Sequence, residues 1–277
     1  MRVKPWTLGI VALLVSSALA ITPDDLVVYW LGKTPAPAPA VQTIDEGLAF
    51  QAAFVQGLEP IVGQPVGYKV GLTSKPVQQK FGVDQPLRGV LLERMLLPSG
   101  AAVPAKFGAV PIVEGDLLVR VKDEGINQAR TPEEVLAHLD AVIPFIELPD
   151  LVLKKGEPLN GATITAINVG ARLGVMGRPI PVENTPEFAE ALGSMQVYVV
   201  QDGRLVLKAP GSAILGHPLN AVVWLVQDLA REGKGLKAGD LVSLGSFGAP
   251  LRPKVGSTVW VGYSFGRWGG EAKVHFE

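Results

Sequence analysis

Cysteine is absent from the 277 residues, and histidine occurs only three times. Without cysteine the chain can form no disulfide, no thiolate nucleophile and no cysteine-ligated zinc site. The histidines, His138, His217 and His275, are scattered along the sequence, so a histidine-rich metal site is not expected. Any bound metal ion is therefore expected to have oxygen ligands.

An excess of charge of either sign is also missing. The 25 Lys and Arg residues nearly balance the 26 Asp and Glu residues, and no run of like charges occurs. A nucleic-acid-binding protein needs a basic excess or patch, so this function class is excluded. Hydrophobic residues make up 48% and charged residues 18% of the sequence, which is sufficient for a large packed core. We expect a folded protein whose partner is a small molecule.

The first twenty residues have the three-part pattern of a secretory signal peptide. Arg2 and Lys4 precede an apolar core at residues 8–15, and small residues follow as far as Ala20. We expect cleavage after Ala20 and a periplasmic or secreted protein without stable membrane insertion. The alternative is an uncleaved anchor, because residues 5–23 carry no charge.

One linker-like stretch divides the rest of the chain. Residues 34–40, a Thr followed by alternating Pro and Ala, separate a short arm at 24–33 from all that follows. We predict an N-terminal helical arm with a Pro/Ala linker at residues 21–62. A single catalytic domain is predicted at residues 63–277.

Capping signals and alternation predict the elements of this chain. Thr43 and Glu46 form a capping box before an apolar stripe, which predicts a helix ending at Gly57. Proline and capping signals predict further helices at 131–139, near 186–192 and from 218 to about 231. Short alternating runs predict strands at 113–121, 241–244, 258–263 and 271–276 and a hairpin at 195–208. This pattern is typical of a β-rich α+β fold with helices at one edge or on one face.

Three carboxylates are candidates for a metal site. Glu114 and Asp116 are two residues apart in a predicted strand, so their side chains share one face, and Glu147 lies within an apolar run. If they converge, they suit a hard divalent cation such as Mg²⁺ or Mn²⁺. In the alternative, Glu114 and Asp116 lie on a solvated sheet face and Glu147 closes a strand.

Lys69 is the candidate acid or base. It lies among glycines and apolar residues at 67–73, and a desolvated lysine can exchange protons near neutral pH. The alternative is a lysine that protects an edge strand from aggregation. Asp84 lies in a segment that also has the composition of an ordinary turn, and the loop at Ser246 could let the backbone approach a carboxylate ligand.

Taken in order, these segments resemble the 2-keto-4-pentenoate hydratase branch of the fumarylacetoacetate hydrolase superfamily. The resemblance covers nearly all of the chain after the signal peptide. Its most specific strings are Gly-Tyr-Lys-Val-Gly-Leu-Thr at 67–73, Gly-Val-Asp-Gln-Pro at 82–86, Glu-x-Asp at 114–116, Ile-Pro followed by Glu147, and Gly-His-Pro-Leu-Asn at 216–220.

The resemblance implies a β-rich roll with N-terminal helices and a metal-dependent active site. It implies Glu114, Asp116 and Glu147 as ligands of Mg²⁺ or Mn²⁺, Lys69 and Asp84 as catalytic residues, and Leu72, Asn168 and Ser246 as substrate-binding residues. The implied reaction adds water to a 2-hydroxy-2,4-dienoate and gives a 4-hydroxy-2-oxo acid.

The sequence also departs from the family pattern, which keeps other functions open. Asp116 stands where the family usually has Glu, and Ile167 replaces an Asp that usually precedes Asn168. The alternatives are an exported, catalytically idle relative that binds a small 2-oxo acid or dicarboxylate, a 2-oxo acid decarboxylase, or an acylpyruvate-type C–C hydrolase. The family also implies a homo-oligomer, and the arm before Pro35 could pack on a neighbouring chain.

Overall fold

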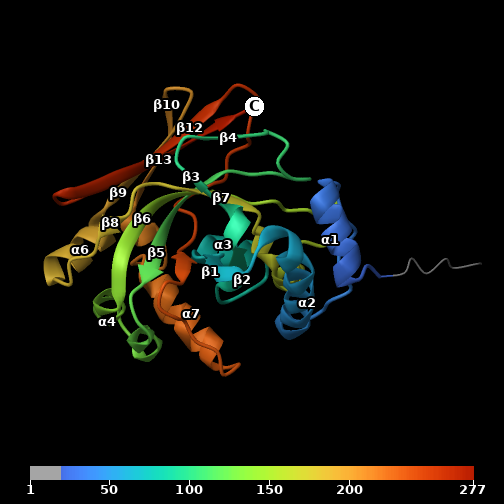
Figure 1. Cartoon of the computed structure of the whole chain (residues 1–277), viewed down its shortest axis with the longest axis horizontal. Helices are drawn as coiled ribbons and strands as arrows, with labels where there is room; N and C mark the ends of the chain where they lie inside the picture. Colours follow the sequence, from blue (N-terminus) through green and yellow to red (C-terminus); the bar gives the residue numbers. More distant parts are fainter. Residues whose placement is uncertain (1–19) are drawn as a thin grey trace, which may run out of the picture.

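A computed structural model describes residues 20–277, so the signal-peptide prediction lies outside the described residues. Two twisted sheets form the framework of the protein (Figure 1). The larger sheet has eight strands and the smaller sheet has five. This architecture confirms the predicted α+β, β-rich roll with N-terminal helices.

The larger sheet is mostly antiparallel and has β11 and β5 near its centre. Its order is β2 (Leu87–Leu92), β1 (Pro65–Gly71), β11 (Leu241–Ser243), β5 (Glu114–Val121), β6 (Leu139–Leu148), β7 (Leu173–Met176) and β3 (Leu96–Pro98), with β8 (Ile180–Pro181) also paired to β6. The β1–β11 pair is parallel, whereas β11–β5 and β5–β6 are antiparallel. Lys69 therefore lies opposite Ser243, and Glu114 lies opposite Glu147.

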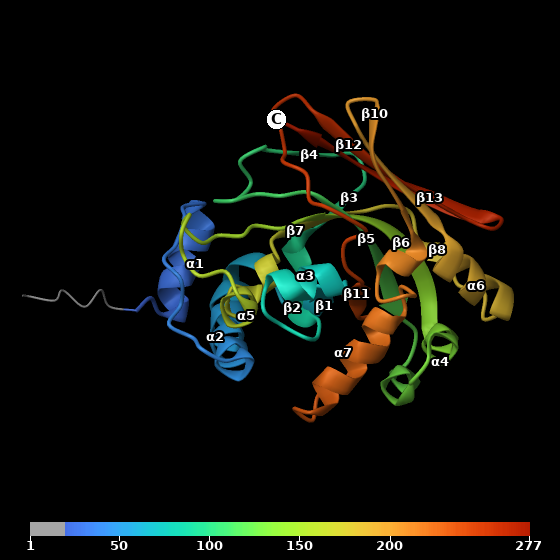
Figure 2. The same cartoon turned by 180° about the vertical axis from the view of Figure 1, so that it is seen from behind.

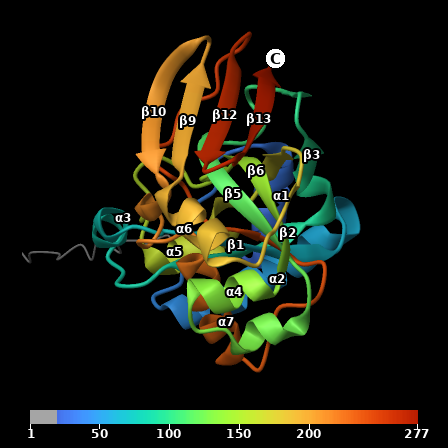
Figure 3. The same ribbon diagram turned by 90° about the vertical axis from the view of Figure 1, so that its left-hand side faces the viewer.

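The smaller sheet stands over one face of the larger sheet (Figure 3). Its order is β10 (Arg204–Pro210), β9 (Gln196–Gln201), β12 (Thr258–Phe265), β13 (Trp268–Phe276) and β4 (Ala101–Val103). The main core fills the space beneath it with side chains such as Leu117, Val119, Val199 and Val261, all of which are buried. The predicted hairpin at 195–208 is confirmed as β9 and β10.

The helices form two groups, one on each side of the larger sheet (Figure 2), where the sequence led us to expect one edge or one face. α4 (Pro132–Ala137), α6 (Pro186–Ser194) and α7 (Asn220–Ala230) contribute to the main core. α1 (Pro23–Gly32) and α2 (Ile44–Val62) form a second core, close to the short helices α3 (Lys75–Lys80) and α5 (Gly161–Ala166). Four short 3₁₀ helices complete the fold: η1 (Glu93–Met95), η2 (Glu124–Gln128), η3 (Asn168–Gly170) and η4 (Gly211–Ala213).

The start of α2 confirms the predicted capping box, but its predicted end is wrong. The amide of Glu46 donates to the Thr43 hydroxyl at 3.1 Å, and the Glu46 carboxylate accepts from the Thr43 amide. The helix continues past Gly57 to Val62. A Cβ at Gly57 would lie 2.8 Å from a methyl carbon of Val27 in α1, so this glycine permits close helix packing and does not end the helix.

The arm before the Pro/Ala linker is the helix α1, and it packs on its own chain. Leu26 and Trp30 are buried against Phe54 and Leu58 of α2. Within residues 20–277, none of the helices combines the length and apolar character needed to cross a membrane. The predicted domain limits at 21–62 and 63–277 stay predictions, because both parts share this second core.

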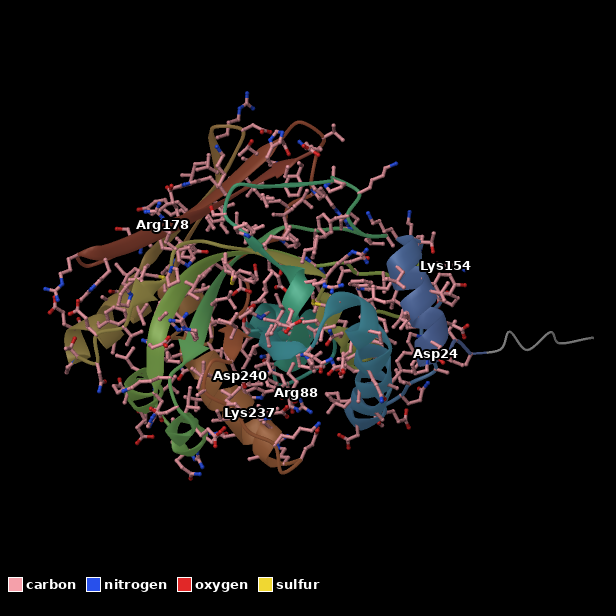
Figure 4. All side chains as sticks on the ribbon, in the orientation of Figure 1. Asp24, Arg88, Lys154, Arg178, Lys237 and Asp240 are labelled. Carbon is pink, nitrogen blue, oxygen red and sulfur yellow. The ribbon has the colours of Figure 1, made fainter. Side chains whose placement is uncertain are left out.

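α7 is attached to the larger sheet by a buried arginine. Arg88 of β2 contacts the carboxylates of Asp228 in α7 and of Glu232 just beyond it. Figure 4 shows Arg88 next to α7, with Lys237 and Asp240 close by. This ion-pair network fixes the helix to the edge of the sheet that carries β2.

Candidate active site

One end of the larger sheet collects most of the predicted site residues. β1 and β11 run in parallel, so the segments that follow them, with Leu72 and Ser246, leave the sheet at the same end. β2 and β5 run in the opposite direction, so Asp84 precedes β2 and Glu114 begins β5 at that end. β6 brings Glu147 there directly opposite Glu114.

The Glu-Gly-Asp segment of β5 places two carboxylates on one face of the strand and a glycine on the other face, where the two sheets pack closely. Glu114 and Asp116 share one face of the strand, while Gly115 faces the smaller sheet. A Cβ at Gly115 would lie 2.9 Å from a methyl carbon of Val199, so only glycine lets the two sheets approach this closely behind the site. Asp116 is fully buried and Glu114 partly exposed, which makes the solvated-face alternative wrong for Asp116.

Lys69 is the positively charged residue beside these carboxylates. β1 lies between β2 and β11, so the edge-strand alternative for Lys69 is wrong. Its side chain is 4% exposed, and its ammonium group contacts the Glu147 carboxylate, which is also 4% exposed. The structure thus places Lys69 in contact with Glu147, Glu114 opposite Glu147, and Asp116 on the same strand face as Glu114.

Asp116 is held in place by neighbouring strands. Its Oδ2 accepts a hydrogen bond from the Ser243 hydroxyl at 2.6 Å, and its Oδ1 accepts one from the Gly245 amide at 2.9 Å. The Tyr263 hydroxyl of the smaller sheet donates to the carbonyl oxygen of Asp116 and lies 3.0 Å from that of Phe145. These contacts fix both the carboxylate and the backbone of this residue.

The cluster has more negative than positive groups, and this changes its acid–base behaviour. Burial and the nearby charge of Glu147 raise the pKa of Glu114 to about 8, although the Lys69 ammonium opposes the shift. Burial and Glu147 also raise the pKa of Asp116 to about 7, against the effect of its hydrogen bond from Ser243. Near neutral pH the cluster therefore keeps a proton that a cation could displace.

The donor set fits a hard divalent cation in its chemistry. All three carboxylates offer oxygen atoms, and one lysine does not balance their charge. Across residues 20–277, no three Asp, Glu, His or Cys side chains already point at one common position for a metal ion. A cation would have to compete with Lys69 for Glu147 and with the protons of Glu114 and Asp116.

Asn168 lies close to Lys69 but its side chain is bound to the backbone. Its Oδ1 accepts from the Val90 amide at 2.7 Å, and its Nδ2 donates to the Val90 carbonyl at 2.9 Å. A Cβ at Gly89 would lie 3.0 Å from Cγ of Lys69 and 2.6 Å from the carbonyl oxygen of Asn168. Asn168 therefore positions β2 beside Lys69, and its contact with substrate stays a prediction.

Leu72 and Ser246 lie next to the cluster on adjoining loops. Leu72 adopts a left-handed conformation with φ of 57°, and it precedes Thr73, which packs against Gly245. The Ser246 hydroxyl donates to the Gly248 carbonyl at 2.9 Å and closes the loop after β11. Their role in substrate binding also stays a prediction.

Asp84 is the predicted site residue that the structure leaves apart. It is exposed in the turn before β2 and lines a depression of about 650 Å³. In the described part of the chain, no hydrogen bond or ion pair joins its side chain to Lys69 or to the three carboxylates. Phe81, Val83 and Asn160 line the same depression.

Sequence reasoning missed two residues that support the cluster. Ser243 had no assigned role, although a serine in a buried strand indicates a hydrogen-bond partner. Tyr263 was recognised only as part of a strand, yet a tyrosine that alternation turns inward needs a partner for its hydroxyl. Both contact Asp116 from chain segments far away in sequence.

Comparisons with known proteins place this chain among hydratases. No protein-family model matches the sequence. The chain is 31% identical over 215 residues to a 2-keto-4-pentenoate hydratase of Paraburkholderia xenovorans (strain LB400), covering 77% of each chain. It is 33% identical over 190 residues to a 2-hydroxyhexa-2,4-dienoate hydratase of Comamonas testosteroni, covering 68% of this chain and 70% of that one.

Solved structures show the same fold. A 4-oxalocrotonate decarboxylase from Pseudomonas putida G7, complexed with magnesium and adipate, matches 92% of this chain and 96% of its own with a TM-score of 0.81 and 24% identity. Further matches with lower TM-scores include fumarylacetoacetate hydrolase family proteins. The chain has the fold of these proteins, and by its sequence it belongs to the 2-keto-4-pentenoate hydratase family and is an enzyme of the hydro-lyase class.

Proposed function

We propose that the protein is a divalent-metal-dependent hydratase that adds water to a 2-hydroxy-2,4-dienoate and releases a 4-hydroxy-2-oxo acid. The observation that carries this proposal is the buried cluster of Lys69 with Glu114, Asp116 and Glu147. Relatives named as hydratases of 2-keto-4-pentenoate and of 2-hydroxyhexa-2,4-dienoate support the substrate class.

The three carboxylates are the residues that would hold Mg²⁺ or Mn²⁺. When bound, such a cation supplies Lewis-acid stabilisation of the negative charge that develops on the C2 oxygen of the substrate. Glu114, Asp116 and Glu147 provide the ligand oxygens, and Ser243 and Gly245 orient Asp116 through hydrogen bonds.

Lys69 is the group that moves protons in this proposal. The C2 hydroxyl of the dienol loses a proton and C5 gains one, which gives a 2-oxo-3-ene acid. Water then adds across the C3–C4 double bond, with the hydroxyl going to C4 and a proton to C3. The Lys69 ammonium lies within the cluster on Glu147, so it is placed to exchange these protons.

The loops at Leu72 and Ser246 and the turn at Asp84 border the proposed substrate site. The backbone amide of Ser246 is proposed to bind the substrate carboxylate, because the neighbouring amides of Gly245, Phe247 and Gly248 already donate to other groups. Asp84 is proposed to assist proton transfer after closing over the bound substrate.

The experiment uses purified protein that is stripped of metal and then given Mg²⁺ or Mn²⁺. The ultraviolet absorbance of 2-hydroxypenta-2,4-dienoate is followed and the product identified by mass, with Lys69→Ala as the control. Metal-dependent loss of the dienol with gain of one water supports the proposal. Turnover without metal, or full activity of Lys69→Ala, overturns it.

A C–C hydrolase is a weaker candidate because it normally needs a histidine or glutamate to activate water. Both ring nitrogens of His217 have backbone partners: Nε2 lies 2.9 Å from the Ala189 carbonyl, and Nδ1 accepts from the Leu219 amide at 3.2 Å. An exported idle relative would instead show no turnover but metal-dependent thermal stabilisation by oxalate or pyruvate. Loss of carbon dioxide from a 2-oxo acid would indicate a decarboxylase.

We also propose export, on the basis of the predicted signal peptide. The relatives' names give no compartment for this chain. N-terminal sequencing of the native product tests the proposal, and a chain that begins at Met1 contradicts cleavage after Ala20.

A homo-oligomer is the last part of the proposal. Leu205 and Val206 on edge strand β10 and Val28 on α1 are large apolar side chains left exposed, with 58%, 44% and 70% of their surface accessible. Such exposed groups favour burial between copies of the chain. Light scattering that gives the mass of one chain contradicts this prediction.

A further inference from the structure

A second buried charged group lies just beyond the metal-site candidates. Asp150 follows Glu147 at the end of β6 and is 1% exposed. Its Oδ1 accepts a hydrogen bond from the Val110 amide at 2.7 Å, and its Oδ2 accepts one from the Ala109 amide at 3.0 Å. A Cβ at Gly108 would lie 2.4 Å from Asp150 Cγ, so the loop passes directly over this carboxylate.

Arg172 is the cation that matches Asp150. Its guanidinium lies 3.3 Å from the Asp150 carboxylate, and the arginine is 5% exposed. Its Nε donates to the carbonyl of Phe107, and its Nη1 donates to the carbonyl of Trp30 at 2.8 Å. The guanidinium also lies 4.0 Å from the centre of the Trp30 ring.

These contacts join three parts of the chain around Arg172. Trp30 belongs to the last turns of α1, which Figure 4 shows ending near Lys154. Phe107 and Val110 belong to the loop that runs directly into Glu114. Asp150 belongs to the segment that leaves Glu147.

Backbone hydrogen bonds make the link from Asp150 to Glu114 stiff. The Ile112 amide donates to the Pro149 carbonyl at 3.0 Å, and the Leu151 amide donates to the Val110 carbonyl at 3.2 Å. Val113 pairs with Leu251 on the other side of the loop. A shift of the loop at Asp150 is therefore transmitted to the first residue of β5, where no side-chain hydrogen bond holds the Glu114 carboxylate among the described residues.

We propose that the Asp150–Arg172 pair positions the Glu114 carboxylate for metal binding and couples this position to the docking of α1. Glu114 differs in this respect from Asp116, which Ser243 and Gly245 hold directly. The inference rests on the proposed function, because it assigns Glu114 to the metal site. Arg172 is a positioning residue and touches neither metal nor substrate.

The test measures Mn²⁺ affinity by calorimetric titration of the purified protein. Arg172→Lys keeps the charge but loses the planar fork that reaches Phe107, Trp30 and Asp150 together. Asp150→Asn is the second variant, because it keeps the shape and removes the charge. Each is expected to weaken Mn²⁺ binding by about tenfold or more and to lower kcat at saturating Mn²⁺, as replacements beside metal ligands do.

Phe188→Leu is the matched control for general destabilisation. Phe188 of α6 is buried in the aromatic cluster with Phe265 and Trp268. Figure 1 shows α6 and α1 on opposite sides of the molecule. We expect it to lower the melting temperature while Mn²⁺ affinity stays at the wild-type value. An equal loss of Mn²⁺ affinity in Phe188→Leu overturns a specific positioning role.

The remaining outcomes separate this inference from the proposed function. If the wild-type protein binds no Mn²⁺, or Glu147→Gln binds it unchanged, the proposed metal site is wrong and the inference falls with it. If the wild type binds Mn²⁺ through Glu147, yet Arg172→Lys and Asp150→Asn bind it equally well, only the positioning role is wrong.

Discussion

Two buried charged clusters lie at the end of β6, and they differ in how their charges are matched. In the cluster at Glu147, Lys69 contacts Glu147, and its charge also acts on Glu114 and Asp116. Glu114 has no side-chain hydrogen bond within the described residues. At Asp150, one arginine meets one carboxylate, and both groups have backbone partners as well.

The difference separates a reactive cluster from a supporting one. Buried carboxylates without a matching cation lower the stability of the folded protein. In the cluster at Glu147, a bound cation would offset this loss. A matched and fully hydrogen-bonded pair holds its surroundings in one arrangement. The two clusters should therefore respond in opposite ways when a charge is removed.

The largest effect is expected from Glu147→Gln. Turnover should fall by about 10³-fold, because Glu147 is both a proposed metal ligand and the ion-pair partner of Lys69. The metal-free protein should be no less stable than the wild type, since one repelling charge is removed and Lys69 keeps Glu114 and Asp116 nearby. Enzyme assays and urea unfolding of the same preparation check both parts, and marked destabilisation without metal would contradict the comparison.

Arg172→Met should show the reverse pattern in stability. Asp150 is left buried without its cation, which typically costs about 3–5 kcal/mol of unfolding free energy. Urea unfolding measures this loss. The double variant with Asp150→Asn should recover part of it, and simple addition of the two single effects would show that the residues do not interact.

Ser243→Ala should have a moderate effect confined to the reactive cluster. The hydroxyl that donates to Asp116 is lost, so the carboxylate binds its proton more tightly and metal more weakly, by about tenfold. Calorimetric titration with Mn²⁺ measures the change. Ser246→Ala is the control, since that hydroxyl bonds to Gly248 and not to a carboxylate.

The smallest expected effect is the pH dependence of the metal-free protein. The pKa values of Glu114 and Asp116 are raised to about 8 and about 7, so between roughly pH 4 and these values the folded state holds more protons than the unfolded state. Stability due to these groups is present at low pH and is lost as the pH rises through 7 to 8. Melting curves should fall by a few degrees from pH 5.5 to 8.

Metal should remove this pH dependence, because it occupies the carboxylates in place of protons. Glu147→Gln should also reduce it, since the charge of Glu147 contributes to both shifts. A melting temperature that rises across the same range in the metal-free protein would show that other groups control its stability.

Local patterns in the sequence predicted the elements better than their contacts. The capping box at Thr43 and Glu46 is decided within four residues, and alternation places Glu114 and Asp116 on one face. The pairing of Glu114 with Glu147 depends on the register of β5 and β6, which alternation does not specify. The family resemblance, and not the spacing, brought Lys69 and Glu147 into one site before the structure was known.

Local sequence patterns could not predict the contacts that support the site, because these contacts join residues far apart in the sequence. Arg172 donates to Trp30, which is 142 residues away in sequence. Glycine is needed at position 57 because a side chain there would meet a methyl group of Val27 in α1. A lone arginine in an apolar segment indicates a buried partner without naming it. The partner is fixed only by the packing of the second core.

The position of β11 determines when this enzyme can finish folding. This strand lies between β1 and β5, yet it comes from the last part of the chain, and the Ser243–Asp116 hydrogen bond spans 127 residues. Until β11 has been synthesised, the edges of β1 and β5 that pair with it remain unpaired, and the larger sheet cannot be completed. In a chain exported before β11 pairs with β1 and β5, the Ser243–Asp116 contact would therefore first form in the compartment where the chain folds.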